Sequence, residues 1–247
     1  MISISYFRAL PEIPVLAVEK GIKLEFLNLL DRVRYSNDFL RRCKDSPWYP
    51  LINSAHAPFF DLIPGTADAE LKALVKDKFK RALEACGELG IKNIVFHSGW
   101  FPKTYPEGEW VDNSLSFWTE ILRFADADTG IFIENVYEDT PTALRKLIQG
   151  MGRDRFKVCL DIGHVNANSS RGLEEWITEL GAAIGHIHIH NNYGVQDDHN
   201  GLGAGTIHID TVLNLFKAQC PNATWNLEVR TEIEESIDRL IAEEGSR

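Results

Sequence analysis

Imidazole and carboxylate side chains recur along this chain at or just after the ends of short apolar runs. They stand in the segments SAHAPFF, IVFHSG, IFIENV, VCLDIGH, GHIHIHNN and WNLEV and in the loop segment DDHNGLGAG. The candidates are His56, His97, Glu134, Asp161, His164, His188, Asp197, His199 and Glu228. Imidazole and carboxylate groups together are ligands for Zn, Mn, Co or Fe ions. Since a carboxylate at the end of an apolar strand is costly to bury unless it is paired or metal-bound, their repetition predicts a divalent-metal site.

The apolar runs that carry these residues are rich in Ile, Val, Leu and Phe and show little strict alternation, which is typical of buried parallel strands. The predicted strands are Ile2–Tyr6, Ile22–Leu27, Leu51–Ala57, Asn93–His97, Gly130–Glu134, Phe156–Asp161, Ile184–His188 and Thr224–Val229. Apolar residues recur at helical spacing between them. The predicted helices are Ala69–Leu89, Leu115–Ala125, Thr140–Gln149, Gly172–Gly181, Ile209–Gln219 and Ile233–Glu244. Thr66 is a candidate cap for the first helix, and the less regular segment from Leu30 to Pro50 has room for a short one.

Eight strands that alternate with helices in 247 residues predict a (β/α)8 TIM barrel of the α/β class, as a single domain over residues 1–247. An open doubly wound sheet is the alternative, but no GxGxxG motif follows the first run, so nothing indicates a dinucleotide site. The C-terminal ends of the strands share one face of a barrel, where barrel enzymes have their active sites. We therefore expect the metal-competent residues to meet on that face.

The composition is that of an ordinary globular protein, with 44% hydrophobic residues and a net charge of −10 from 26 basic and 36 acidic residues. The acidic balance disfavours nucleic acid as a partner, because affinity for DNA comes largely from Lys and Arg that neutralise phosphates. The sequence has no apolar run of the roughly 18 residues that a membrane span needs, and no signal peptide at its start. Its four cysteines are far apart and form no CxxC pair, which favours buried thiols in a cytoplasmic protein.

The motifs HAPF, FHSG, IEN, LDIGH, HIH followed by Asn, and LEV occur in an order that resembles the xylose-isomerase-like TIM barrel superfamily. The resemblance covers essentially the whole chain. That superfamily includes isomerases and epimerases of sugars and sugar phosphates, and also the family 2 apurinic (AP) endonucleases of the endonuclease IV type. The resemblance implies the barrel fold and a metal-dependent reaction, and it leaves the reaction open between these branches.

The isomerase and epimerase branch implies one divalent metal, such as Mn, Zn, Co or Mg, held by Glu134, Asp161, His188 and Glu228. In that branch the metal binds adjacent oxygens of a hydroxy-carbonyl substrate and stabilises the enediolate left by proton removal. Glu134 and Glu228 are then the catalytic general base and acid. His164 resembles a contact to a substrate oxygen. The implied substrate is a small sugar, sugar phosphate or related polyol, and a homo-oligomer is compatible with this branch.

The endonuclease branch implies three zinc ions on nine ligands, and all nine have counterparts here. Beyond the four residues already named, the counterparts are His56, His97, His164, Asp197 and His199. The local motifs depart from that branch, because 161–164 reads Asp-Ile-Gly-His in place of Asp-Thr-Cys-His and 203–205 reads Gly-Ala-Gly in place of Gly-Glu-Gly. These departures and the net charge of −10 favour a small sugar-like substrate over DNA. A lyase or dehydratase on the same scaffold, and a metal-binding barrel without catalysis, remain alternatives.

Five further residues are candidates for substrate binding. Glu25 stands near the end of the second predicted strand, where it contacts substrate, supports the site histidines or pairs with a nearby Lys or Arg. Trp100 and Trp110, in the long loop after the fourth strand, either wall a pocket or pack within the loop. Arg230 is a candidate for a substrate phosphate, and so is Lys103, although the chain has no glycine-rich phosphate motif.

His186 and His190 flank His188 in the sequence HIHIH. Alternation along a strand points all three histidines to the same side. The choice of His188 as the metal ligand therefore rests on the resemblance.

Overall fold

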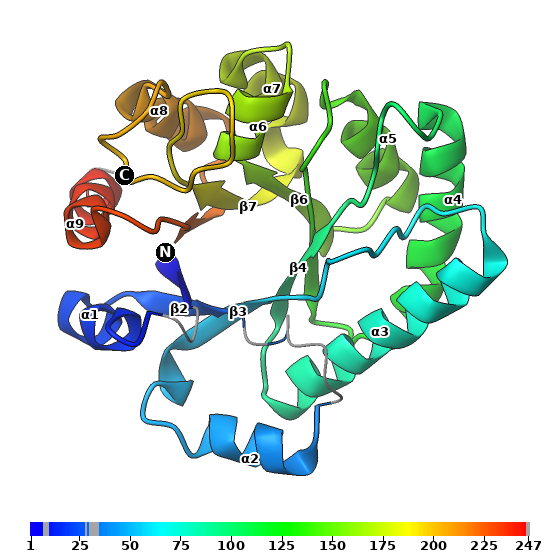
Figure 1. Ribbon diagram of the computed structural model, residues 1–247, viewed down its shortest axis with the longest axis horizontal. Helices are drawn as coiled ribbons and strands as arrows, with labels where there is room; N and C mark the ends of the chain where they lie inside the picture. The colour runs from blue at the N-terminus through cyan, green and yellow to red at the C-terminus, as the bar shows by residue number, and fades with distance from the viewer. Residues whose placement is uncertain (7–9, 28, 30–34, 246–247) are drawn as a thin grey trace.

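The computed structural model describes residues 1–6, 10–27, 29 and 35–245 (Figure 1). Within these residues, eight parallel strands follow one another around a closed barrel, and the last strand pairs with the first. The strands are β1 Ile2–Tyr6, β2 Lys23–Phe26, β3 Ile52–His56, β4 Asn93–His97, β5 Gly130–Glu134, β6 Phe156–Asp161, β7 Ile184–Ile189 and β8 Thr224–Leu227. The predicted (β/α)8 barrel is confirmed.

Helices surround the strands and form most of the connections between them (Figure 1). In the described part of the chain they are α1 Ile13–Lys20, α2 Asn37–Lys44, α3 Ala69–Glu88, α4 Glu107–Ile121, α5 Thr142–Met151, α6 Ile162–Asn168, α7 Leu173–Leu180, α8 Ile209–Gln219 and α9 Ile233–Glu244. Two short 3-10 turns, η2 Tyr49–Leu51 and η3 Gly181–Ala183, precede β3 and β7. Each helix predicted from apolar spacing is present. Helices α8 and α9 have the predicted ends, whereas the other four differ at one end or both.

Helix α3 begins at Ala69 as predicted, but its cap is a different residue. Asp68, not Thr66, is the N-cap, and its carboxylate accepts hydrogen bonds of 2.9 Å from the backbone N–H groups of Glu70 and Leu71. Thr66 accepts a hydrogen bond from the Asp68 backbone instead. A carboxylate at this position satisfies two otherwise free N–H groups and suits the positive end of the helix.

The start of α4 differs from the prediction. The helix begins at Glu107, well before the predicted Leu115. Pro106 precedes it, and Glu107 and Glu109 stand in its first turn, where negative charge is favourable. Trp110 therefore lies on a helix and not in the loop after β4, which corrects its predicted place.

The segment from Leu30 to Pro50 does contain a short helix. In α2, the Ser36 hydroxyl accepts a hydrogen bond of 3.1 Å from the Phe39 backbone and caps the first turn. Residues 30–34 of the segment lie outside the described part of the chain.

The two faces of the barrel sheet carry different side chains. On the outward face, Phe96 packs against Phe79 of α3, with ring centroids 4.7 Å apart. On the inward face, Glu25 of β2 lies 2.9 Å from His186 of β7, and both are buried. Because β2 and β7 are not neighbouring strands, this contact crosses the interior of the barrel. The apolar core thus lies between the strands and the helices, whereas the interior of the barrel is polar.

All four cysteines are buried, as the sequence predicts. In the residues that the structure describes, we find no helix both long enough and apolar enough to cross a lipid bilayer.

Candidate metal centre

Four side chains meet at the C-terminal ends of neighbouring strands. Glu134 ends β5, Asp161 ends β6, His188 lies near the end of β7, and Glu228 directly follows β8. One ligand atom from each lies within 4.8 Å of those of the other three. Nδ1 of His188 is 3.0 Å from a Glu228 oxygen, 3.3 Å from a Glu134 oxygen and 3.7 Å from an Asp161 oxygen. We call these four residues the central group.

The three carboxylates of the central group are each at most 8% exposed. Burial works to raise the pKa of Glu134, but the adjacent His188 and the hydrogen bonds from His188 and His56 outweigh it and hold that pKa well below its usual value. Burial is likewise outweighed by nearby histidines at Asp161 and Glu228, whose pKa values are also lowered. Three ionised carboxylates around one imidazole nitrogen repel one another where little water screens them. This donor set therefore fits a divalent cation.

Asp161 also determines the local structure after β6. Its carboxylate accepts a hydrogen bond of 2.7 Å from the His164 backbone, which caps α6 directly at the end of the strand. The Nδ1–H group of His164 donates to the Asn135 carbonyl at 2.7 Å, and Nε2 lies 3.3 Å from Asp197. The Asn135 side chain in turn bonds both backbone polar groups of Asp161. These bonds hold His164 beside the central group.

A second group adjoins the first through Glu134. Nε2 of His56 lies 2.9 Å from a Glu134 oxygen, and Nε2 of His97 lies 3.3 Å from the same oxygen. The Nδ1–H group of His56 donates to the Ala57 carbonyl at 2.8 Å, which leaves Nε2 facing the carboxylate. Burial lowers the pKa of His97 to about 3, so this imidazole is neutral and able to bind a metal.

A third group consists of His190, Asp197 and His199. Nε2 of His199 lies 2.9 Å from Asp197, and its Nδ1–H group donates to the Glu228 carbonyl at 2.9 Å. His199 has a φ of 52°, an uncommon backbone conformation for a residue with a side chain. Nε2 of His190 lies 3.1 Å from Asp161 and 3.5 Å from Asp197, so this ring connects the third group to the central one.

His190 is a candidate ligand that the sequence-based set omitted. Its ring fits because Gly163 has no side chain, and a Cβ added at Gly163 would overlap the ring. The alternation in HIHIH was the available signal, since it points His190 to the same side as His188. The alternation could not show that Asp161 and Asp197 face this ring.

The remaining candidates lie in different surroundings. Glu25 is fully buried beside His186 and His188, which is the supporting position among its predicted alternatives. Trp110 is fully buried in the hydrophobic core and Trp100 is 6% exposed, and their rings stack with centroids 5.5 Å apart, as the packing alternative predicts. Arg230 is exposed, and its backbone N–H donates to the His199 carbonyl. A role for Arg230 in substrate binding stays a prediction.

The sequence is similar to that of the uncharacterized protein MJ1311 of Methanocaldococcus jannaschii, with 30% identity over 140 residues. The match covers 52% of this chain and 47% of that protein, so the chain spans about half the length of this relative.

Solved structures share the fold over nearly the whole chain. A D-tagatose 3-epimerase-like protein is 23% identical, with a TM-score of 0.79 and coverage of 99% of this chain and 97% of that chain. The TTHB071 protein of Thermus thermophilus, soaked with ZnCl2, is also 23% identical, with a TM-score of 0.79 and coverage of 100% and 98%. D-Psicose 3-epimerase with D-tagatose, from Clostridium cellulolyticum H10, is 15% identical, with a TM-score of 0.75 and coverage of 96% and 89%.

Residues 19–244 match the family model for the xylose isomerase-like TIM barrel, which agrees with the closed barrel and with the ligand-rich face at its strand ends. The chain belongs to the xylose isomerase-like TIM barrel family.

Proposed function

We propose that this protein is a divalent-metal-dependent isomerase or epimerase that acts on a sugar, sugar phosphate or related polyol. The observation that carries the proposal is the buried convergence of three carboxylates on Nδ1 of His188. Family membership supports this class of reaction. Similar solved structures include a D-psicose 3-epimerase with D-tagatose, which supports a small sugar-like substrate.

The central group, Glu134, Asp161, His188 and Glu228, would hold the metal. When bound, a divalent cation supplies positive charge beside adjacent substrate oxygens and so favours loss of a proton from the carbon next to the carbonyl. Asp161 contributes a charged oxygen and also holds α6 in place through its bond to the His164 backbone. His164 bonds the Asn135 carbonyl through Nδ1, and a substrate oxygen at its Nε2 would replace the contact of 3.3 Å with Asp197.

Glu134 and Glu228 are the proton-transfer groups in this proposal. One carboxylate takes the proton from the carbon beside the substrate carbonyl. The other, ionised in the resting site, first takes up a proton from solvent and then returns it, to the neighbouring carbon in an isomerase or to the opposite face of the same carbon in an epimerase. Both residues are buried, at 1% and 8% exposure, so few water molecules compete for the proton.

Metal content and proton exchange test this proposal together. The protein is purified without chelator, and its metals are counted by elemental mass spectrometry. It is then incubated in D2O with a panel of ketoses and aldoses, with and without phosphate. We expect close to one metal per chain and deuterium at one carbon of at least one sugar, both lost with chelator and restored by Mn, Co, Zn or Mg. Bound metal without deuterium uptake from any sugar would contradict the reaction class.

A three-metal phosphodiesterase of the endonuclease IV type is the second candidate. It is favoured by the three adjoining groups, in which His56, His164 and His199 each bond Nδ1 to a backbone carbonyl and turn Nε2 toward a carboxylate. It predicts close to three zinc ions per chain, nicking of DNA at abasic sites, and loss of nicking on His97→Ala. The net charge of −10 weighs against it, because DNA has to lie along the face of the protein.

A further inference from the structure

Glu25 lies beneath the central group and is fully buried inside the barrel. One of its oxygens is 2.9 Å from Nε2 of His188, and the other is 2.9 Å from Nε2 of His186. Ser54 donates a hydrogen bond of 2.8 Å and Asn226 one of 3.2 Å to the same carboxylate. Glu25 is therefore a buried carboxylate that faces two histidines.

His186 is held from both ends of its ring. Nε2 bonds Glu25, and Nδ1 bonds the Thr224 hydroxyl at 2.5 Å. An ionised carboxylate only accepts hydrogen bonds, so the proton of a neutral His186 is on Nε2 and the Thr224 hydroxyl donates to Nδ1. His186 thus bonds the oxygen of Glu25 that does not face His188.

The two ring nitrogens of His188 face different partners. Nε2 faces Glu25, whereas Nδ1 faces the carboxylates of Glu134 and Glu228. Nε2 is buried and has no aligned hydrogen bond within the described residues, although the Glu25 oxygen lies 2.9 Å away. A carboxylate at that distance favours a proton on Nε2 and leaves the lone pair of Nδ1 for a metal.

We propose that Glu25 is a positioning residue for the metal centre, which keeps the proton of His188 on Nε2 and presents Nδ1 to the metal. The inference rests on the metal site of the proposed function and assigns a role to a residue that touches neither metal nor substrate. Carboxylates that bond the far nitrogen of a ligand histidine raise its basicity and fix its orientation.

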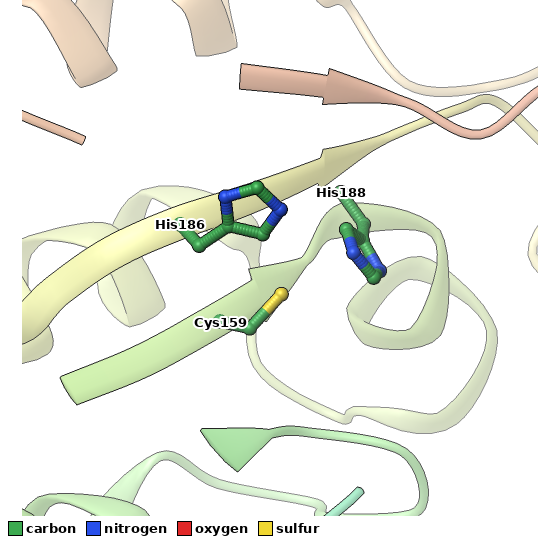
Figure 2. Close-up of side chains that lie close together, drawn as sticks. All are labelled: Cys159, His186 and His188. Atoms are coloured by element: carbon green, nitrogen blue, oxygen red, sulfur yellow. The ribbon is translucent and has the colours of Figure 1, made fainter. Parts of the chain in front are cut away.

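Cys159 of β6 lies close enough to His186 and His188 to form a second metal site with them, which is the alternative to a supporting role for His186. Figure 2 shows its thiol beside the rings of His186 and His188, which stand on β7, and the three ligand atoms lie within 4.8 Å of one another. Both nitrogens of His186 already have partners, Glu25 and Thr224, so a metal bound here would have to break one of these bonds. The geometry favours a support for His188 over a second metal site at Cys159.

The test compares metal affinity in the wild-type chain, Glu25→Gln and Glu138→Gln. A carboxylate can accept from both histidines, whereas an amide has one acceptor oxygen and can serve only one of them. We expect Glu25→Gln to weaken Zn²⁺ and Co²⁺ binding by about 10- to 100-fold and to change the visible spectrum of the Co²⁺ form. Chelator competition measures the affinities, and the spectrum reports the ligand geometry, which a merely structural residue would leave unchanged.

Glu138→Gln is the matched control. Glu138 is 1% exposed, and its carboxylate bonds Ser98 and the Val136 backbone, so the substitution makes the same exchange of carboxylate for amide at a similarly buried place. We expect wild-type affinity and an unchanged Co²⁺ spectrum for this variant. Equal weakening in both variants would overturn the positioning role, because a loss of charge alone would then account for it.

A measurement on the wild type guards against a Glu25→Gln variant that fails to fold. In the Zn²⁺-loaded chain labelled with ¹⁵N, NMR should show His188 protonated at Nε2 and metal-bound at Nδ1, and the reverse assignment would overturn the inference. If the wild type binds no metal, this inference and the proposed function both fail. If Glu25→Gln weakens binding but no sugar exchanges its proton, the positioning role stands and only the isomerase proposal falls.

Discussion

The outward and inward faces of the barrel sheet use the same strands for opposite purposes. Outward, Phe96 packs against Phe79 and Trp118, with ring centroids 4.7 and 5.1 Å apart. Inward, Glu25 and His186 are equally buried, but they contact each other and further polar groups. Apolar burial contributes about 25 cal/mol per Å² to stability, whereas a buried ion pair roughly offsets its own desolvation.

We therefore expect the outward face to contribute mainly to folding stability and the inward face mainly to metal binding and activity. Because the carboxylates of the central group repel one another, replacing one of them by its amide should change metal binding and activity more than unfolding. Outward residues should show the reverse. A residue that breaks this division would show that the two faces are coupled.

Glu228→Gln tests the inward face most strongly. The amide keeps the shape of the side chain but removes a charged ligand oxygen and a proton-transfer group. We expect turnover of the substrate found in the sugar panel to fall by about 10²- to 10⁴-fold, with circular dichroism and the unfolding temperature little changed. Near-normal turnover in a correctly folded Glu228→Gln protein would disprove the role of Glu228.

Trp118→Ala makes the corresponding test on the outward face. Trp118 is fully buried, and its ring packs against Phe79, Phe96 and Phe156. We expect a loss of about 3–5 kcal/mol in the free energy of unfolding, because truncation leaves a cavity. Urea denaturation measures the loss, and metal affinity should stay at the wild-type value. A large fall in affinity would mean that the faces are coupled.

Gly163→Ala sharpens the comparison within the inward face. The added Cβ would overlap the His190 ring, so we expect His190 to move away from Asp161 and Asp197. Overpacking of this kind destabilises by about 1–3 kcal/mol. Gly87→Ala is the control, since a Cβ there meets nothing within 4 Å. If the third group holds metal, Gly163→Ala should reduce the metal count per chain, and an unchanged count would exclude His190 as a ligand.

Asp68→Ala changes neither face of the barrel sheet and should have the smallest effect on stability of these substitutions. It removes the carboxylate that bonds the Glu70 and Leu71 backbone at the start of α3. We expect a loss of about 1 kcal/mol in the free energy of unfolding, measured by urea denaturation. Thr66→Ala is a useful partner, because Thr66 bonds the cap residue and not the helix, and it should cost less. The opposite ranking would restore Thr66 as the cap.

The local sequence pattern was sufficient to predict much of the fold. The apolar runs and the helical spacing between them predicted the barrel, and parallel strands end on one face whatever the loops do. The position of each candidate ligand at a strand end therefore followed from its place in a run. Glu134 and Asp161, which end β5 and β6, are examples.

Residue types predicted the ends of the helices less well than their presence. Both Thr66 and Asp68 can cap a helix, and only the fold shows which side chain reaches the free N–H groups of α3. The early start of α4 likewise depends on packing, because Trp110 is buried in the core once the helix includes it.

The amino-acid sequence by itself determined which residue types stand at the strand ends and so the kind of chemistry they support. Only the tertiary structure decided which side chains meet across the barrel. Glu25 and His188 are far apart in the chain and on strands that are not neighbours, yet their side chains lie 2.9 Å apart. His190 joins Asp197 because Gly163 leaves room for its ring. Such contacts depend on the closure and width of the barrel, which the spacing of residues along one strand does not encode.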